Sequence, residues 1–216
     1  MFKDVTVIGA GRAGSAVAAR LRERGVAVRA GGELRLLCVP DRAIAEVARA
    51  LEPGPWVAHV SGGTPLAALD PHVHRFSVHP LQTLTAAGGA GQLDGAWAAV
   101  TAETREAHGH GTWLAETLGL QPFVLADDKR ALYHAGASMA SNFLVTLYRA
   151  AERLFEEAGA PPAALIPLME RTIENGFDLT GPIARGDWET VDRHVAALEG
   201  SDLEPLYAAL AEATRA

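Results

Sequence analysis

The chain has 216 residues, and its 19 Lys and Arg against 26 Asp and Glu give a formal net charge of -7 at pH 7. This balance argues against nucleic acid or an anionic membrane surface as the main partner. No apolar run reaches membrane-spanning length, and the segment after Met1 lacks the apolar core of a signal peptide. With a single cysteine, Cys38, we expect a cytoplasmic protein.

The first predicted element is a buried strand that runs directly into a glycine-rich turn. Residues 5–8 are β-branched, and the Ala-rich segment after Gly14 predicts a helix. The turn has the G-x-G-x-x-G spacing of dinucleotide-binding turns, in which a pyrophosphate rests on the helix N-terminus. The alternative is a turn that keeps the fold without binding a nucleotide. The candidate cofactor-binding residues here are Gly9, Ala10, Gly11, Arg12, Ala13 and Gly14.

A second strand is predicted over residues 25–29, and it ends in Arg29. An acidic residue near this position binds the ribose hydroxyls of NAD, whereas an arginine suits the 2′-phosphate of NADP. We therefore expect NADP rather than NAD, with a solvated Arg29 as the alternative. Only residues 30–33 precede the next strand, residues 34–40, so the usual crossover helix has no room. This predicts a tight loop or a locally antiparallel pair, and a trimmed adenine pocket.

Alternating strands and helices continue to residue 126 and predict a doubly wound, mostly parallel α/β sheet. The expected strands are 56–60, 74–78, 96–100 and 122–125; the expected helices are 42–51, capped by Asp41, and 104–118; a mobile loop is expected over 84–94. The carboxyl ends of parallel strands meet at one sheet edge. We therefore expect Val39, Pro40 and Ser61 along the cofactor and His79 near the substrate. Alternatively, His79 bonds a backbone carbonyl in a turn.

The second half of the chain predicts helices only, over residues 131–158, 163–175, 188–198 and 203–214. We place the domain border after residue 126, with a dinucleotide-binding domain at 1–126 and a helical substrate or dimerisation domain at 127–216.

A polar stripe marks the first of these helices, which we expect to be mostly buried. His134, Ser138, Ser141 and Asn142 follow helical spacing. Such groups need partners, either another helix or a substrate. Lys129 is a candidate proton donor or carboxylate ligand, or else a solvated residue of an acidic turn. The candidate catalytic residues are His79, Lys129, His134 and Asn142, and no metal is expected, because the paired histidines have no third ligand nearby.

Several motifs together resemble a known family. They are residues 9–14, 38–41, 59–62, 79–83, 133–135 with 141–142, and 179–187. They are similar to a two-domain, 6-phosphogluconate-dehydrogenase-like family of Rossmann-type NADP oxidoreductases. That family is related to pyrroline-5-carboxylate reductase, ketopantoate reductase and the deazaflavin-dependent NADP reductases. The resemblance implies an NADP-type cofactor, a helical C-terminal domain and a homodimer built through the helix 131–158. The short segment after the second strand departs from the family pattern.

The residues and the resemblance lead to one functional hypothesis. The protein is expected to transfer hydride between NADP and a small, anionic carbonyl or imine compound, with no nucleic-acid or membrane partner. One alternative is a non-catalytic dinucleotide-binding or regulatory protein, and another is a structural dimer without a ligand. Titration with NADPH and NADH separates the last alternative from the other two, and a turnover screen separates an enzyme from a sensor.

Overall fold

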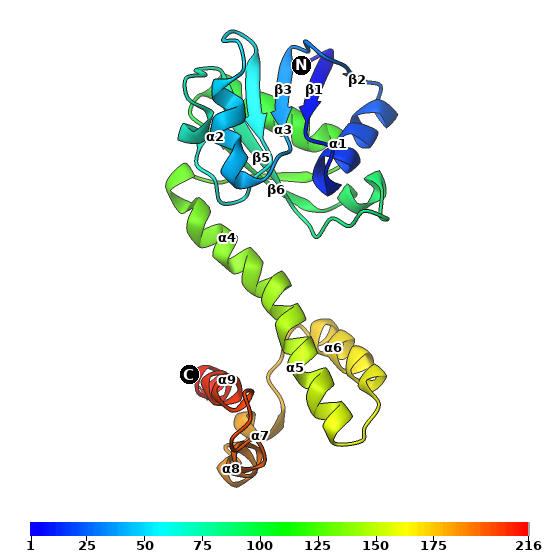
Figure 1. Ribbon diagram of the computed structural model, residues 1–216, viewed down its shortest axis with the longest axis vertical. Helices are drawn as coiled ribbons and strands as arrows, with labels where there is room; N and C mark the ends of the chain where they lie inside the picture. Colours follow the sequence, from blue (N-terminus) through cyan, green and yellow to red (C-terminus); the bar gives the residue numbers. More distant parts are fainter. Residues whose placement is uncertain (216) are drawn as a thin grey trace. The chain divides into compact units, whose positions relative to one another are not determined.

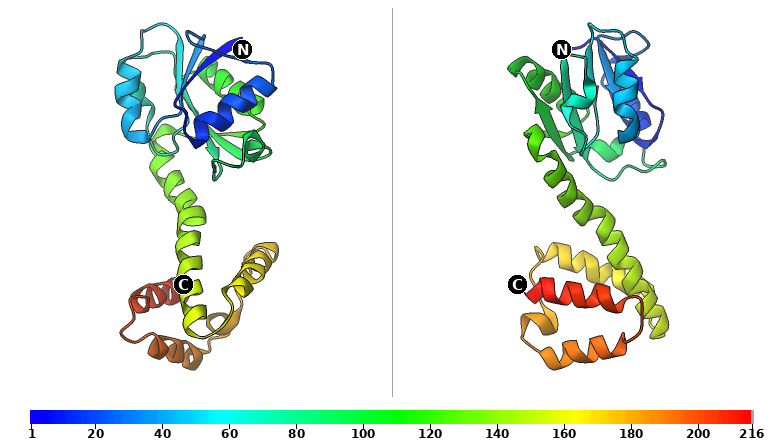
Figure 2. Two further views of the ribbon diagram at one scale, coloured as in Figure 1. Left: turned by 45° about the vertical axis from the view of Figure 1, so that its right-hand side comes forward. Right: turned by 60° about the vertical axis from the view of Figure 1, so that its left-hand side comes forward.

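The computed structural model describes residues 1–215, which form two compact units divided between Ser141 and Asn142. The first unit is a β-sheet with helices on both faces, and the second is all-helical (Figure 1, Figure 2). The compact division lies later than residue 126, because the first turns of helix α4 (Arg130–Ser138) pack with the sheet. The functional domain border that the sequence predicts after residue 126 stays a prediction.

The sheet has seven strands in the order β2-β1-β3-β4-β5-β6-β7. They are β1 (Asp4–Ile8), β2 (Ala27–Val28), β3 (Leu34–Leu37), β4 (Trp56–His59), β5 (Arg75–Leu81), β6 (Trp97–Ala102) and β7 (Gln121–Val124). All neighbouring strands are parallel except β5 and β6, which are antiparallel. This confirms the predicted doubly wound, mostly parallel α/β fold.

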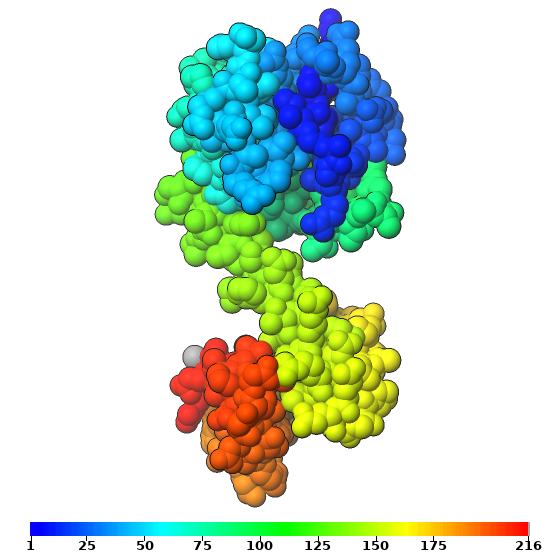
Figure 3. Space-filling model, in the orientation of Figure 1, coloured from blue at the N-terminus to red at the C-terminus, as the bar shows by residue number. Residues whose placement is uncertain are grey.

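Helices cover the sheet on both faces because side chains alternate along each strand. Leu36, Ala58 and Phe76 pack in the core under α1 (Arg12–Glu23) and α3 (Arg105–Thr117). The core on the other face lies under α2 (Asp41–Arg49) and the 3-10 helix η1 (Leu66–Leu69). Both α1 and α2 lie at the surface of this unit (Figure 3).

Two expectations for this unit are wrong in detail. Asp41 does not cap α2: Pro40 occupies the cap position, and Asp41 lies in the first turn, where its charge favours the helix dipole. The segment expected as a mobile loop contains a 3-10 helix, η2 (Ala90–Leu93), that packs on α1. Arg20 of α1 holds it by donating to the carbonyl of Ala90 at 2.9 Å and to Asp94 at 2.8 Å.

The connection from β2 to β3 explains the missing helix. Both strands are parallel to β1 and lie on either side of it, so the locally antiparallel alternative is wrong and the tight-loop alternative is confirmed. The loop crosses the face of β1, where Thr6 Oγ1 donates to the carbonyl of Arg29 at 2.8 Å and accepts from the N–H of Gly32 at 2.8 Å. A Cβ on Gly32 would lie 2.8 Å from the backbone nitrogen of Thr6. Glycine therefore lets five residues replace a crossover helix.

A row of polar side chains is buried in the middle of the sheet. His59, Ser77 and Thr101 lie opposite one another on β4, β5 and β6, and all three are buried. The Nδ1 of His59 accepts a hydrogen bond from the N–H of Ser61 at 3.2 Å. Burial disfavours the charged imidazolium and, with a smaller contribution from Arg130 and then His79, lowers the pKa of His59 to about 3.

The long helix predicted over 131–158 is present with one interruption. A π-helical turn, η4 (Met139–Phe143), separates α4 from α5 (Leu144–Glu157). The helix is not mostly buried as expected: the side chains of Leu132 and Phe143 are 76% and 56% exposed. No helix among residues 1–215 has the length and apolar character needed to cross a bilayer.

The second unit is built from short helices after α5. They are η5 (Pro162–Ala164), α6 (Leu165–Glu174), α7 (Gly181–Ala184), α8 (Trp188–Ala197) and α9 (Glu204–Arg215). Asp187 caps α8, because its carboxylate accepts from the N–H of Thr190 at 3.1 Å. The motif 179–187 contains the short helix α7.

The crossing loop yields the first prediction. Gly32→Ala should lower the free energy of unfolding by about 2–3 kcal/mol, because its Cβ would overlap backbone atoms of β1. Backbone atoms, unlike the end of a flexible side chain, cannot move aside to relieve the overlap. Gly109→Ala is the control, because a Cβ there meets no atom within 4 Å and alanine favours a helix. Urea unfolding measures both. Equal stability of the two variants would contradict the close crossing.

The buried imidazole of His59 yields the second prediction. In the unfolded chain a histidine takes up its proton near pH 6.5, whereas folded His59 resists protonation until about pH 3. Between these pH values the unfolded state binds more protons than the folded state. The contribution of neutral His59 to the free energy of unfolding is therefore fully present above pH 6.5 and decreases as the pH falls toward 3. The free energy of unfolding of the wild type should decrease from pH 7 to pH 4 more steeply than that of His59→Asn. Parallel curves would exclude a titrating role for His59.

Candidate functional site

Three turns meet at the carboxyl edge of the sheet, after β1, β3 and β4. Cys38 donates its N–H to the carbonyl of Ile8 at 2.7 Å, which holds the first two turns together. Gly9 has a φ of +111°, and a Cβ there would lie 2.4 Å from the carbonyl oxygen of Cys38. A Cβ on Gly14 would lie 2.0 Å from the carbonyl oxygen of Gly9. Gly9 and Gly14 are thus required by the packing of the turn itself.

Gly11 has the opposite surroundings. It is the N-cap residue of α1, and a Cβ on it would meet no atom within 4 Å. Within residues 1–215 no side chain caps this helix, so the N–H groups of its first turn are free. Ala10, Gly11 and Arg12 are exposed, whereas Ala13 is half-buried. An open, uncapped helix start of this kind fits a pyrophosphate.

The remaining predicted cofactor residues lie close to these turns. Val39 and Pro40 follow β3, half-buried and exposed respectively. Arg29 follows β2, and its Nε donates to Asp4 Oδ2 at 3.0 Å while its side chain stays 67% exposed. The N–H of Glu33 and the guanidinium of Arg29 together lower the pKa of Asp4. Arg29 therefore lies at the expected position, but its guanidinium also pairs with a carboxylate of β1.

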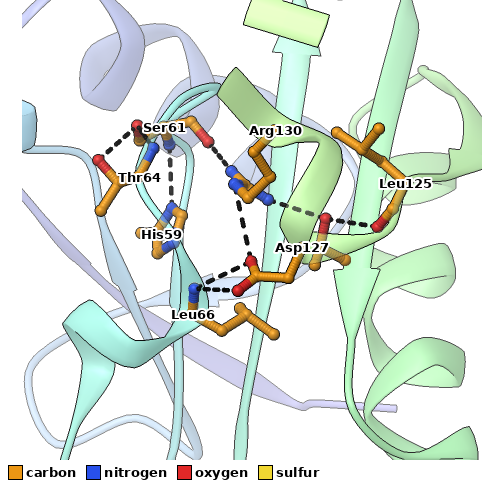
Figure 4. A network of polar contacts seen from close by, with 8 residues as sticks. His59, Ser61, Thr64, Leu66, Leu125, Asp127 and Arg130 are labelled. Atoms are coloured by element: carbon orange, nitrogen blue, oxygen red, sulfur yellow. Dashed lines mark hydrogen bonds and ion pairs between the residues drawn. The ribbon is translucent and has the colours of Figure 1, made fainter. Parts of the chain in front are cut away.

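Ser61 uses its side chain within its own turn. Its Oγ donates to Thr64 Oγ1 at 2.9 Å and accepts from the N–H of Thr64 at 3.0 Å. Its carbonyl accepts a hydrogen bond from the guanidinium of Arg130 (Figure 4). The hydroxyl of Ser61 thus shapes the turn after β4 rather than pointing free into the site.

Arg130, the first residue of α4, is the largest of the fully buried side chains, with 1% exposure. Its Nη1 donates to Thr101 Oγ1 at 2.8 Å, and its Nε lies 4.0 Å from Asp127 Oδ1. Asp127 in turn accepts from the N–H of Leu66 at 3.0 Å. This network joins the turn after β4, the strand β6 and the start of α4 (Figure 4). Burial lowers the pKa of Arg130, and the nearby carboxylate of Asp127 opposes that shift.

Sequence reasoning missed Arg130. The signal that points to it is its spacing, since it lies four residues before His134 and so continues the polar stripe by one turn.

His79 lies within a strand rather than at its end, which corrects the expected stop at residue 78. β5 continues to Leu81 and pairs with β6, placing His79 opposite Ala99 and Pro80 opposite Ala98. Proline is tolerated because β4 ends at His59 and leaves this part of β5 without a neighbour on that side.

The imidazole of His79 meets two side chains of α4. Its Nδ1 lies 2.8 Å from Tyr133 Oη, and its ring lies 5.9 Å from that of His134 at an angle of 88°. A Cβ on Gly62 would lie 2.7 Å from His134 Cδ2 and 2.8 Å from His79 Cε1. The absent side chain of Gly62 therefore leaves room for the two imidazoles. The alternative of a turn histidine bonded to a backbone carbonyl is wrong.

Burial controls the charge of this cluster. It lowers the pKa of His79 to about 4, with smaller contributions from His134 and Arg130. It also raises the pKa of Tyr133 to about 12. At neutral pH the pair is therefore an uncharged imidazole and a protonated phenol, which can donate and accept hydrogen bonds.

The other two predicted catalytic residues are exposed. Lys129 is exposed, with its Nζ 3.1 Å from Asp128 Oδ2, as the solvated alternative describes. Asn142 is exposed and belongs to the second compact unit. Across residues 1–215 no three His, Cys, Asp or Glu side chains converge as metal ligands would.

Solved structures share this fold over nearly the whole chain. "Putative NADP oxidoreductase BF3122" from Bacteroides fragilis matches with a TM-score of 0.82 and 19% identity, covering 99% of this chain and 98% of that one. Protein TM1727 from Thermotoga maritima matches with a TM-score of 0.76 and 23% identity, covering 99% and 90%. The 1-pyrroline-5-carboxylate reductase of Streptococcus pyogenes matches with a TM-score of 0.62 and 15% identity, covering 98% and 96%. These matches confirm the Rossmann-type resemblance.

Sequence comparison adds one family. No curated protein matches the chain. The model of the domain of unknown function DUF2520 matches residues 96–214, which is more than half of the chain. The chain therefore belongs to the DUF2520 family, with a Rossmann-type sheet unit followed by a helical one.

Proposed function

We propose that this protein is an NADP-dependent oxidoreductase that acts on a small, anionic carbonyl or imine compound. The open start of α1 carries the proposal. Gly11 leaves free space next to the unbonded N–H groups of the first helical turn, although the packing of the described chain does not require a glycine at this position. The likeness to one protein named a "putative NADP oxidoreductase" and to a 1-pyrroline-5-carboxylate reductase supports it.

The turns at the carboxyl edge would hold the coenzyme. Residues 9–14 would bind the pyrophosphate, and Val39, Pro40 and the turn at Ser61 would lie along the nucleotide. Arg29 is exposed at the end of β2 and would bind the 2′-phosphate, sharing its guanidinium with Asp4. When bound, the nicotinamide supplies or accepts the hydride.

His79 and His134 would face the substrate, because their rings converge beside Gly62 at the same sheet edge. Both come from rigid elements, a strand and a helix, which favours precise placement of a reacting group. The catalytic roles assigned to Lys129 and Asn142 stay predictions.

We also propose that two copies of the chain associate through the long helix. On and just before α5, the side chains of Phe143, Leu144, Val145 and Leu147 are exposed. Figure 3 shows part of α5, in yellow-green, open at the surface of the second unit. The described core of this unit contains only four buried large hydrophobic residues, Leu165, Val191, Leu198 and Leu203. A small unit with so much exposed apolar surface gains stability from a partner.

Coenzyme binding tests the function directly. Gly11→Val should keep the fold, since its side chain enters open space, and should weaken NADPH binding at least tenfold by occupying the pyrophosphate site. Gly109→Val is the control, because its Cβ also meets no atom but lies on α3. Fluorescence titration measures binding, and circular dichroism checks the fold.

In the same titration the wild type should bind NADPH more tightly than NADH. Unchanged affinity in Gly11→Val would remove the coenzyme from this turn. Tight binding without turnover of any carbonyl or imine compound would favour the non-catalytic nucleotide-binding alternative.

The dimer has its own test. Phe143→Glu should shift the protein toward a monomer, because the new carboxylate would lose its hydration at an apolar interface. Arg149→Glu, an exposed position on the same helix, is the control for added negative charge. Light scattering over a concentration series measures the mass. A wild type that is monomeric at high concentration would contradict the proposal.

A further inference from the structure

Tyr133, the hydrogen-bond partner of His79, supports an inference that goes beyond the coenzyme site. This inference rests on the proposed function. Tyr133 lies on α4 three residues after Arg130, and its hydroxyl is 2.8 Å from His79 Nδ1. Its ring packs edge-on against Phe123 of β7, with ring centroids 5.9 Å apart. The phenol is therefore held from two sides by strands of the sheet.

The other ring nitrogen of His79 has different surroundings. Among residues 1–215 the Nε2 has no hydrogen-bond partner, and it is not one of the polar atoms sealed from solvent. It faces the space beside Gly62, where a Cβ would lie 2.9 Å from it. One nitrogen is thus held by Tyr133 while the other is open to the site.

Chemistry decides the direction of the hydrogen bond. An imidazole nitrogen is a stronger base than a phenol oxygen, so the phenol O–H donates and Nδ1 accepts. The neutral ring then carries its proton on Nε2. Burial, which keeps the imidazole uncharged and the phenol protonated at neutral pH, is consistent with this arrangement.

We propose that Tyr133 is a positioning residue that holds His79 as the Nε2–H tautomer and relays a proton through it to a carbonyl oxygen. A bound reduced nicotinamide would supply the hydride to the carbonyl carbon, and the C=O π pair would move to the oxygen. That oxygen takes the proton from Nε2 as Nδ1 takes the proton from the phenol. After the alcohol leaves, Nε2 takes a proton from solvent and Nδ1 returns its proton to the tyrosinate oxygen, which restores the Nε2–H tautomer. Alcohol oxidation runs through the same steps in reverse.

This relay selects the substrate class. Reduction of a carbonyl compound needs a proton at the oxygen, and a fixed N–H donor directed at a lone pair supplies it. A protonated imine already carries its proton and has no lone pair to accept a hydrogen bond. The structure therefore favours aldehydes and ketones over imines.

The tautomer is measured by nitrogen NMR on the coenzyme-free protein with isotope-labelled histidine, where the His79 signals are those lost in His79→Asn. In the wild type, Nδ1 should be unprotonated and Nε2 protonated. In Tyr133→Phe a population with protonated Nδ1 should appear. A protonated Nδ1 in the wild type, or no change in Tyr133→Phe, would overturn the proposal.

A second histidine–tyrosine pair supplies the control. His194 Nδ1 lies 2.6 Å from Tyr207 Oη in the other unit. Tyr207→Phe should change the signals of His194 and leave those of His79 unchanged. A change at His79 in this variant would mean that the tautomer does not depend on Tyr133 alone.

Coenzyme binding and turnover separate this proposal from the proposed function. Tyr133→Phe should bind NADPH as the wild type does and should reduce 2-keto acids and aldehydes on the order of 10²-fold more slowly. If NADPH fails to bind the wild type while the tautomer result holds, the oxidoreductase assignment fails and the Tyr133–His79 relationship stands. Turnover of cyclic imines with none of carbonyl compounds would overturn the substrate class.

Discussion

The buried guanidinium of Arg130 is the interaction on which the rest of the candidate site depends. A charge removed from water needs compensating partners. Arg130 donates to Ser61 and Thr101, and its Nε, which has no hydrogen-bond partner among residues 1–215, lies 4.0 Å from the carboxylate of Asp127. These partners come from three separate parts of the chain, so the network fixes where α4 starts. Because Tyr133 and His134 lie on the next turn of that helix, their approach to His79 follows from the position of Arg130.

The glycines of the carboxyl edge have two different physical roles. Gly9, Gly14 and Gly62 are required by the packing of the protein itself, since a Cβ at each would overlap backbone atoms or an imidazole. Gly11 is surrounded by open space, so nothing in the described chain explains its small size. The spacing of the motif does not distinguish between these glycines. The atoms around each glycine do: Gly9 and Gly14 are needed for the fold, whereas Gly11 leaves space for a ligand.

The short crossing between β2 and β3 shows how a Rossmann-type sheet loses a helix and keeps its order. A parallel crossover needs enough chain to pass over the intervening strand. Here the loop passes directly over β1, with Gly32 against the backbone and Thr6 satisfying its polar groups. The same loop brings Glu33 and Arg29 to the carboxylate of Asp4, so the end of β2 is held although the strand has only two residues.

The sequence by itself determined the layered architecture, because strand-length apolar runs, helical periodicity and the glycine spacing are local properties of the chain. It also placed Gly11 and His79 at the correct edge, since parallel strands bring their carboxyl ends together. Only the tertiary structure decided that β5 continues past His79, that Arg130 rather than Lys129 is buried, and that Tyr133 is the partner of His79. Those outcomes depend on contacts between residues distant along the chain, where burial and hydrogen bonding of neighbours override local preference.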